Sequence, residues 1–433
     1  MARPFILLCG VGLFAFISYN LVRMPVLSLF AQSLGAGPEA IGFIVAASTL
    51  TGVFLKWPAG ALSDLYDRRW LLLVGLLAFA LPPFCYLLVT DVPWLIALRF
   101  VHGMATAVFA PIALAVVADL RREARGAAYG AYTAATQAGA MLGPLLGGWL
   151  LLTGGFSAAF VTAGTLGVIA VLLFFLMRLP PVPGRVNRES LIVNRWEEVK
   201  RETLNVKRAE SDDSRITDNV EHHRAAGFSR LAVIRDMARG ARTVLGNVRV
   251  VVTSATDGAR QVANGALMAF LPIYVVGIGL DAAQAGMLFG VQSVTSFASR
   301  PTMGWASDRI GRRPLILLGL VVCAGSLAAI PFTTPFVGLM ALSALFGFGE
   351  AIVNASAAAL VADLSELKTL GSAMGMQGTI MDIGHASGPI LSGVLIGALG
   401  FQLAFPIIAG LVLVAAGVFR ASVGAERPVG LAS

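Results

Sequence analysis

The sequence predicts an all-α membrane protein with about twelve transmembrane helices in two similar six-helix bundles. Three observations predict this class: long apolar segments, few charged residues and an internal repeat. Of the 433 residues, 57% are hydrophobic and 13% are charged, whereas soluble domains carry roughly 25% charge. So much apolar surface has to face lipid rather than water.

The apolar segments recur along the whole chain, and each is long enough to cross a hydrocarbon core of about 30 Å. In the first half we expect helices near residues 5–33, 39–63, 70–90, 93–118, 125–153 and 156–178. In the second half we expect them near residues 249–277, 282–306, 313–332, 335–362, 369–397 and 400–421. The first segment is too long for a signal-peptide core and lacks a convincing cleavage site, so it is interpreted as a membrane helix.

This pattern divides the chain into an N-terminal bundle (1–178), a linker (179–248), a C-terminal bundle (249–421) and a tail (422–433). Within the linker, apolar residues from Phe228 to Leu245 recur at helical spacing with arginines between them. They predict either a basic amphipathic helix on an anionic membrane surface or a solvated linker helix.

Lysine and arginine lie at one side of the predicted helices, whereas the opposite loops carry only acidic charges, such as Glu39, Asp91 and Asp281. The positive-inside rule then places both termini and the linker in the cytoplasm, for which we expect a bacterial inner membrane. The net charge of +8 belongs to helix ends rather than to a separate basic domain, so no nucleic-acid partner is expected. Three cysteines inside apolar segments do not suggest a disulfide framework.

The repeat joins the two halves at an offset of 244 residues. The segment from Gly60 through Asp64 to Arg69 returns as the segment from Gly304 through Asp308 to Arg313. The same offset carries Asp119 to Asp363 and Lys56 to Arg300. An offset of 245 residues relates two glycine patterns, which comprise Gly139, Gly143, Pro144, Gly147 and Gly148 in the first half and Gly384, Gly388 and Pro389 in the second. Two similar apolar halves predict two bundles that rock about a shared site.

These motifs resemble the major facilitator superfamily over nearly the whole chain. The pattern Gly-x-Leu-x-Asp-x-x-Gly-Arg-Arg is the family's most specific signature; the second copy departs only by Ala306, whereas the first has Leu65 and Asp67 in place of the usual Arg and Gly. The resemblance implies a gate in which each Asp caps a helix of the other half and joins an ion-pair cluster. The matching residues are Gly60, Asp64, Arg68, Arg69, Asp119, Gly304, Asp308, Arg309, Gly311, Arg312, Arg313 and Asp363. The alternative is that these basic residues only anchor the inside face.

The glycine pattern around Pro144 is typical, in this family, of exporters that exchange substrate for protons. Its glycines predict a smooth face for close helix packing, and Pro144 removes a backbone hydrogen bond and bends the helix. The alternative interpretation is a packing face between the halves.

Intramembrane charges are costly, so those present in only one half are candidates for function. For proton coupling we expect Asp382 or Glu350, supported by His385, with Asp257 as a further candidate. Helical spacing predicts that Asp257 pairs with Arg260 and that Glu350 shares a face with Asn354. The remaining cavity candidates are Arg23, Arg99, His102, Arg260, Asn354 and Gln137. For each residue the alternative is a buried structural ion pair, and Lys56 and Arg300, present in both halves, are interpreted as matched residues that snorkel near the cytoplasmic end.

The resemblance and these charges predict a proton-coupled exporter of a small organic molecule, similar to the drug:proton antiporter branch. Alternatives are a proton-coupled importer or facilitator of a polar or anionic metabolite, and a non-transporting membrane receptor. The excess of basic over acidic membrane residues favours anionic or neutral substrates. Without a Walker A loop, a His-Glu-x-x-His site or a nucleophile elbow, an enzyme is not expected. We expect no cofactor and no metal, a proton gradient as the energy source, and a monomer whose partners are the bilayer and a small-molecule substrate.

Overall fold

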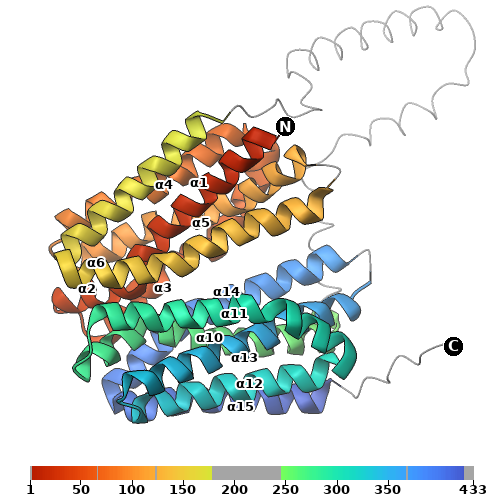
Figure 1. Ribbon diagram of the computed structural model, residues 1–433. Coiled ribbons are helices and arrows are strands. Elements are labelled where there is room, and N and C mark those ends of the chain that lie inside the picture. Colours follow the sequence, from red (N-terminus) through yellow and green to blue (C-terminus); the bar gives the residue numbers. More distant parts are fainter. Residues whose placement is uncertain (1, 66, 122–123, 178–244, 367–368, 424–433) are drawn as a thin grey trace, which may run out of the picture. The chain divides into compact units, whose positions relative to one another are not determined.

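The computed structural model describes residues 2–65, 67–121, 124–177, 245–366 and 369–423, and the side chains of residues 57, 58, 60–65 and 125 are outside this description. The predicted linker helix from Phe228 to Leu245 therefore lies almost entirely outside the described residues, as does most of the tail. The described residues 2–177 and 245–423 belong to one unit, whose helices are shown in Figure 1.

The first half contains the six predicted helices in order. The first span consists of α1 (Ala2–Leu21), a π-helical turn (Val22–Val26) and α2 (Leu27–Ser33). It is followed by α3 (Pro38–Leu65), α4 (Arg68–Cys85), a 3₁₀ turn (Tyr86–Leu88), α5 (Val92–Leu120) and α6 (Arg125–Phe175). The fifth and sixth spans are the two parts of α6, because Gly155 interrupts it with φ 69° and ψ −169°, a left-handed conformation that favours glycine.

The second half has the same sequence of elements. It consists of α10 (Val248–Gly277), α11 (Ala282–Ile310), α12 (Arg312–Ala329), a 3₁₀ turn (Ile330–Phe332), α13 (Phe336–Asp363), α14 (Leu370–Leu399) and α15 (Phe401–Ser422). Among the described residues, ten helical segments are long and apolar enough to span a membrane. Helix α6 counts as one of these ten segments but supplies two spans, which makes eleven. Helix α11 is not among the ten and is the twelfth span, so the predicted total of twelve is confirmed.

The backbone of the first span is broken near the middle of the bundle. Met24 is non-helical, with φ −143° and ψ 127°, and Pro25 follows it. Irregular backbone at membrane depth is tolerated where protein covers it, and Val22, Pro25 and Val26 are buried here. The break directly follows Arg23, one of the predicted cavity residues.

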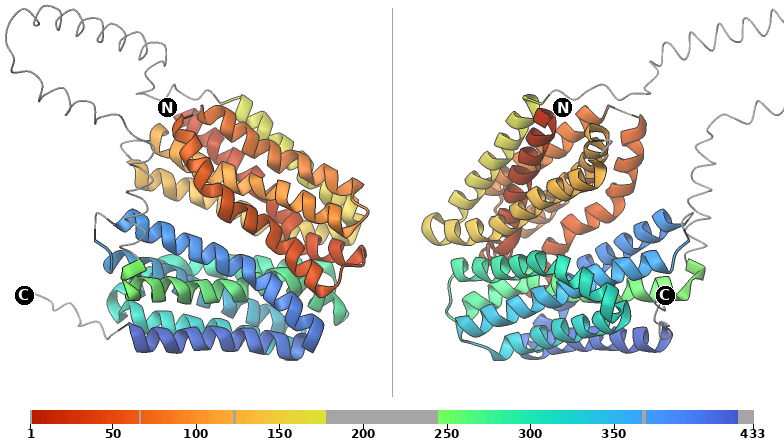
Figure 2. Two further views of the ribbon diagram at one scale, coloured as in Figure 1. Left: turned by 180° about the vertical axis from the view of Figure 1, so that it is seen from behind. Right: turned by 45° about the vertical axis from the view of Figure 1, so that its right-hand side comes forward.

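Two pairs of helices make the most extensive contacts between the halves: α3 packs against α14, and α6 packs against α11. In Figures 1 and 2 the red-to-yellow helices of the first half and the green-to-blue helices of the second form two groups. At these contacts the backbones of the two helices approach each other closely. A side chain at Gly42 would collide with the carbonyl of Pro389, and one at Gly286 would collide with the carbonyl of Pro144. Small residues at these positions allow the helices to approach.

Most of the predicted glycine face packs within its own half. Gly139, Gly143 and Gly147 lie against the backbone of the first span. Their counterparts Gly384 and Gly388 lie against α10. Only the last glycine of the first pattern, Gly148, approaches the other half, at Ala282 and Ala283 of α11. The pattern therefore fixes the first span against α6 and contributes Gly148 and the carbonyl of Pro144 to the junction.

The two copies of the signature loop have different backbone geometries. Gly311 ends α11 with φ 101°, which glycine adopts without strain. Asp67, at the corresponding position of the first copy, has φ −64° and accepts a hydrogen bond from the backbone N–H of Arg69 at 3.0 Å. Asp67 thus serves as the N-cap of α4, a role that suits aspartate.

Candidate substrate and proton site between the two halves

The second half buries a polar cluster around Arg260. Its Nε donates to Asp257 Oδ1 at 2.9 Å, and its Nη2 donates to Asn354 Oδ1 at 2.8 Å. Nη1 lies 3.7 Å from Glu350 Oε1. Gln377 also donates to Asp257, at 3.4 Å. The predicted pair of Asp257 and Arg260 is confirmed, and the cluster ties α10 to α13 and α14 around one cation and two carboxylates.

The first half buries a cation with neutral partners. Arg99 is 0% exposed; its Nε donates to the carbonyl of Ile44 at 3.3 Å, and its Nη2 donates to Ser48 Oγ. No carboxylate among the described residues forms an ion pair with Arg99. Removing a guanidinium from water is costly unless its donors and its charge are compensated.

His102 lies beside this cation in an aromatic setting. Its Nδ1 is 3.0 Å from the hydroxyl of Tyr86. Its ring meets the Tyr19 ring edge-on, with 4.9 Å between the centroids. Tyr19 in turn lies 5.7 Å from the guanidinium carbon of Arg23, within the range of a cation–π contact. A continuous polar and aromatic series therefore runs from Arg99 to Arg23.

Two polar contacts between described side chains cross between the halves. Lys56 Nζ on α3 lies 2.5 Å from Asp382 Oδ2 on α14. Arg23 Nη2, beside the break in the first span, lies 2.6 Å from His385 Nε2 on α14. These contacts correct two expectations. Lys56 is bound to a carboxylate of the other half rather than free to snorkel, and His385 bonds Arg23 rather than Asp382, its neighbour on α14.

Sequence reasoning missed several partners of the predicted residues. Gln137 is half-buried on α6. Ser48, Tyr86 and Gln377 are neutral, so a search for unmatched charges could not single them out. Tyr19 precedes Arg23 by four positions, a helical spacing that could have indicated their contact.

The signature residues at the ends of α4 and α12 pair within their own halves. Arg68 donates to Asp119, and Arg312 bonds both Asp308 at 2.7 Å and Asp363 at 2.6 Å. Arg313 donates to the carbonyl of Arg420, and Arg309 lies over the Trp305 ring. The Asp64 side chain is outside the described residues. The described partner of Asp308 is Arg312 of the same half, and not a helix of the opposite half as the resemblance implies.

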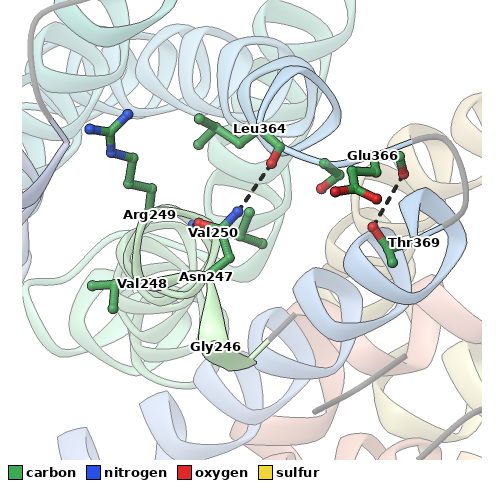
Figure 3. Close-up of a pocket in the computed structure, with 9 residues that line it drawn as sticks. Gly246, Asn247, Val248, Arg249, Val250, Leu364, Glu366 and Thr369 are labelled. Atoms are coloured by element: carbon green, nitrogen blue, oxygen red, sulfur yellow. Dashed lines mark hydrogen bonds between the residues drawn. The ribbon is translucent and has the colours of Figure 1, made fainter. Parts of the chain in front are cut away.

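A cavity of about 510 Å³ lies at the beginning of α10, beside the connection from α13 to α14. Figure 3 shows Asn247, whose Nδ2 donates to the carbonyl of Leu364 at 3.1 Å, and Thr369, which bonds the carbonyl of Glu366. None of the predicted proton-coupling or cavity residues lines it. The candidate site formed by the buried charges is therefore separate from this cavity.

Twelve helices in two repeated halves, with buried charges meeting where the halves join, define a membrane transport protein. The chain belongs to the Major Facilitator Superfamily, whose family model matches residues 7–226 and 259–431.

Relatives and solved structures agree with this assignment. An uncharacterized MFS-type transporter of Methanocaldococcus jannaschii is 23% identical over 90% of this chain and 92% of its own length. The multidrug resistance protein MdtG of Salmonella typhimurium is 25% identical over 92% of this chain and 89% of its own length. The nucleoside transporter NupG has the same fold, with a TM-score of 0.72, 15% identity and coverage of 97% and 100%. A bacterial homolog of the human lysosomal transporter Spinster, in an inward-facing and unoccupied conformation, has a TM-score of 0.74, 15% identity and 96% coverage of both chains.

Proposed function

We propose that this protein is a secondary active transporter that exports a small organic molecule in exchange for protons by alternating access. The observation that carries the proposal is the ion pair between Lys56 and Asp382, at 2.5 Å across the two halves. The similarity to MdtG and the glycine pattern around Pro144 support export. The positive-inside rule supports a cytoplasmic position for the arginine-rich helix ends and for both termini.

The ion pair links proton binding to the contact between α3 and α14. An ionised Asp382 attracts Lys56 across the junction. A proton on Asp382 removes this attraction and leaves the lysine charge without its partner. The side chains of Lys56 and Asp382 are 45% and 28% exposed, so protons can reach the carboxylate. Proton binding thereby shifts the balance between arrangements of the two halves.

Glu350 is the second proton candidate and is held differently. It lies in the buried Arg260 cluster, 3.7 Å from the guanidinium and on the same cation as Asp257. The Asp257 carboxylate makes the closer contact with this cation, at 2.8 Å. A proton on Glu350 would leave the Asp257–Arg260 pair intact. Asp382 is therefore the first residue to test and Glu350 the second.

The second candidate function is a proton-coupled importer or facilitator of a polar or anionic metabolite. The specific observation in its favour is the pair of first-half arginines, Arg23 and Arg99, that have no carboxylate bound among the described residues. A non-transporting receptor is the remaining alternative. It would tolerate neutralisation of the membrane charges, whereas a transporter would not.

Proton flux in proteoliposomes tests the proposal. A pH gradient is imposed, a dye reports lumenal pH, and lipophilic cations, organic anions and sugars are added in turn. We expect at least one compound to discharge the gradient with the wild type and not with Asp382→Asn combined with Glu350→Gln. The matched control is Glu366→Gln, which removes an exposed carboxylate outside the site and should behave as the wild type does.

Two outcomes would contradict the proposal. Retained proton flux in the double variant would exclude both carboxylates as coupling groups. If labelled solutes equilibrate while no compound moves protons, the protein is a facilitator.

A further inference from the structure

The basic residues of the membrane region fall into two groups by their partners. Arg260 is bound by Asp257 and lies near Glu350, and Lys56 is bound by Asp382. Among the described residues, Arg23 and Arg99 of the first half and Arg300 on α11 form no ion pair within 4 Å. Arg23 and Arg99 also lie close enough to each other to interact electrostatically. Two neighbouring cations in a region of low dielectric constant create a strong positive potential, which attracts anions.

On one edge of the Arg23 guanidinium, only one of the two N–H donor groups has a partner. Its Nη2 bonds His385 Nε2 at 2.6 Å, while its Nε is buried without a partner among the described residues. The N–H groups of Nε and Nη2 lie on the same side of a guanidinium. Together they match the two oxygens of a carboxylate or the oxygens of a phosphonate, an arrangement stronger than a bond to a neutral acceptor.

His385 is suited to be replaced at this edge. An Nε2 atom that accepts from arginine carries no proton, so the ring is neutral and its proton is on Nδ1. That Nδ1 is also buried without a partner among the described residues. The imidazole therefore supplies one neutral acceptor to a cation that could take two charged ones. The carboxylate of Asp382 acts on Arg23 from a longer range, but Lys56 already binds it.

We propose that Arg23 is the anchoring residue for an organic anion, whose carboxylate or phosphonate group accepts bonds from Nε and Nη2 in place of His385. The proposal rests on the proposed transport function and names its substrate class. The positive potential of Arg99 draws the anion toward the first half, and the Tyr19 ring beside Arg23 provides an apolar surface for the ligand. Loss of the Arg23–His385 bond also removes a contact between the halves at the broken first span. Anion binding thus breaks one of the contacts between the halves, as substrate binding must do for the halves to move apart.

Equilibrium binding to the purified, full-length protein tests this without protons or flux. The probes are pairs of an anion and a neutral analogue: benzoate with benzamide, 2-naphthoate with 2-naphthamide, and phenylphosphonate with its dimethyl ester. Affinity is measured by calorimetry in a phospholipid-free detergent. We expect at least one anion to bind tenfold or more tightly than its neutral partner. Arg23→Gln should lose this preference, and Arg23→Lys, which keeps the charge but not the paired donors, should retain part of it.

Controls separate the anchor from general effects of charge and folding. Arg249→Gln removes an exposed cation at the beginning of α10 and should leave the preference unchanged. His385→Ala removes the competing acceptor and should raise anion affinity several-fold. A neutral probe that binds Arg23→Gln as it binds the wild type, together with a monodisperse elution profile, shows that the variant is folded.

The proposal is overturned if no anion in the panel binds the wild type more tightly than its neutral partner, or if Arg23→Gln keeps the preference. A second arm adds phosphatidylglycerol. If this lipid, and none of the small anions, stabilises the wild type in an Arg23-dependent way, the arginine holds a lipid headgroup and not a substrate. Because the assay contains no proton gradient, it can succeed even if proton-coupled export is wrong.

Discussion

The two halves bury their charges in opposite ways. In the second half, Arg260 is surrounded by Asp257, Glu350 and Asn354, so acceptors outnumber the cation. In the first half, Arg99 donates to neutral acceptors, a serine hydroxyl and a backbone carbonyl. Among the described residues, the two polar contacts across the junction each join a first-half cation to a second-half acceptor: Lys56 to Asp382 and Arg23 to His385.

The repeat explains why this difference is informative. Where the repeat has the same residue type in both halves, as in the arginine–aspartate pairs at the helix ends, the residues stabilise each bundle from within. Where the residue types differ, as at Arg23, Asp382 and His385, they determine which side of the junction is cationic and which side carries acceptors. A cationic side facing an acceptor side is held together by attraction, and either protons on the acceptors or anions on the cations can weaken it.

The largest expected effect compares the two buried arginines. Arg260→Met leaves Asp257 buried without its cation, and breaking a buried ion pair costs about 3–5 kcal/mol. Arg99→Met removes a charge that no carboxylate balances, so we expect less than half of that loss. Unfolding of the purified protein, followed by intrinsic fluorescence in detergent, measures both.

A double-mutant cycle controls this comparison. Asp257→Asn combined with Arg260→Met should recover part of the stability lost in Arg260→Met, because the unpaired carboxylate is gone. If Arg99→Met destabilises the protein as much as Arg260→Met does, the first-half arginine has an anionic partner and the contrast between the halves is wrong.

An intermediate effect is expected at the two helix pairs that connect the halves. Gly286→Leu on α11 and Gly42→Leu on α3 each place a side chain against a backbone carbonyl of the opposite half. Overpacking costs about 1–3 kcal/mol, so the closely packed arrangement should lose about 5- to 150-fold in population. Labelling of Ala283→Cys by a membrane-impermeant maleimide, in a background without other cysteines, measures this opening.

The matched control is Gly410→Leu on α15, where no heavy atom lies within 4 Å of the added carbon. This substitution should leave labelling unchanged. Equal effects at Gly42 and Gly286 would mean that the halves are mechanically equivalent at the junction despite their opposite charges. An effect at only one of them would locate the moving contact there.

The smallest effect concerns the ion pairs at the helix ends. The Asp119 side chain is 31% exposed, whereas that of Asp363 is 55% exposed. Solvent weakens such pairs to at most about 1 kcal/mol. We therefore expect Asp119→Asn to lower stability more than Asp363→Asn, in unfolding experiments at low salt. High salt should reduce the difference, and the reverse order would show that exposure does not govern these pairs.

Much of the fold could be predicted because lipid imposes it. Hydrocarbon requires every spanning segment to satisfy its own backbone, so apolar length alone located the helices. The repeat then located the second half. The Asp257–Arg260 pair was also predictable, because residues three apart share a helix face.

The contacts across the junction could not be predicted in this way. Lys56 and Asp382 lie on different helices of different halves, and no spacing along the chain brings them together. The repeat even misled the interpretation of Lys56, since its counterpart Arg300 suggested a shared anchoring role. Only the packing of α3 against α14 shows that one member of this matched pair faces a carboxylate.

Helix α11 has a consequence for how the protein is made. Among the described helices it is too polar to be recognised as a span by its composition, and the side-chain amide of its Gln292 donates to Asn264 of α10 at 3.2 Å. A segment of this kind partitions poorly from the translocon into lipid by itself. We infer that α11 enters the membrane only when α6 and α10 are already there to cover it. The order of the halves along the chain then matters for biosynthesis, because the first half provides a surface on which the second can be completed.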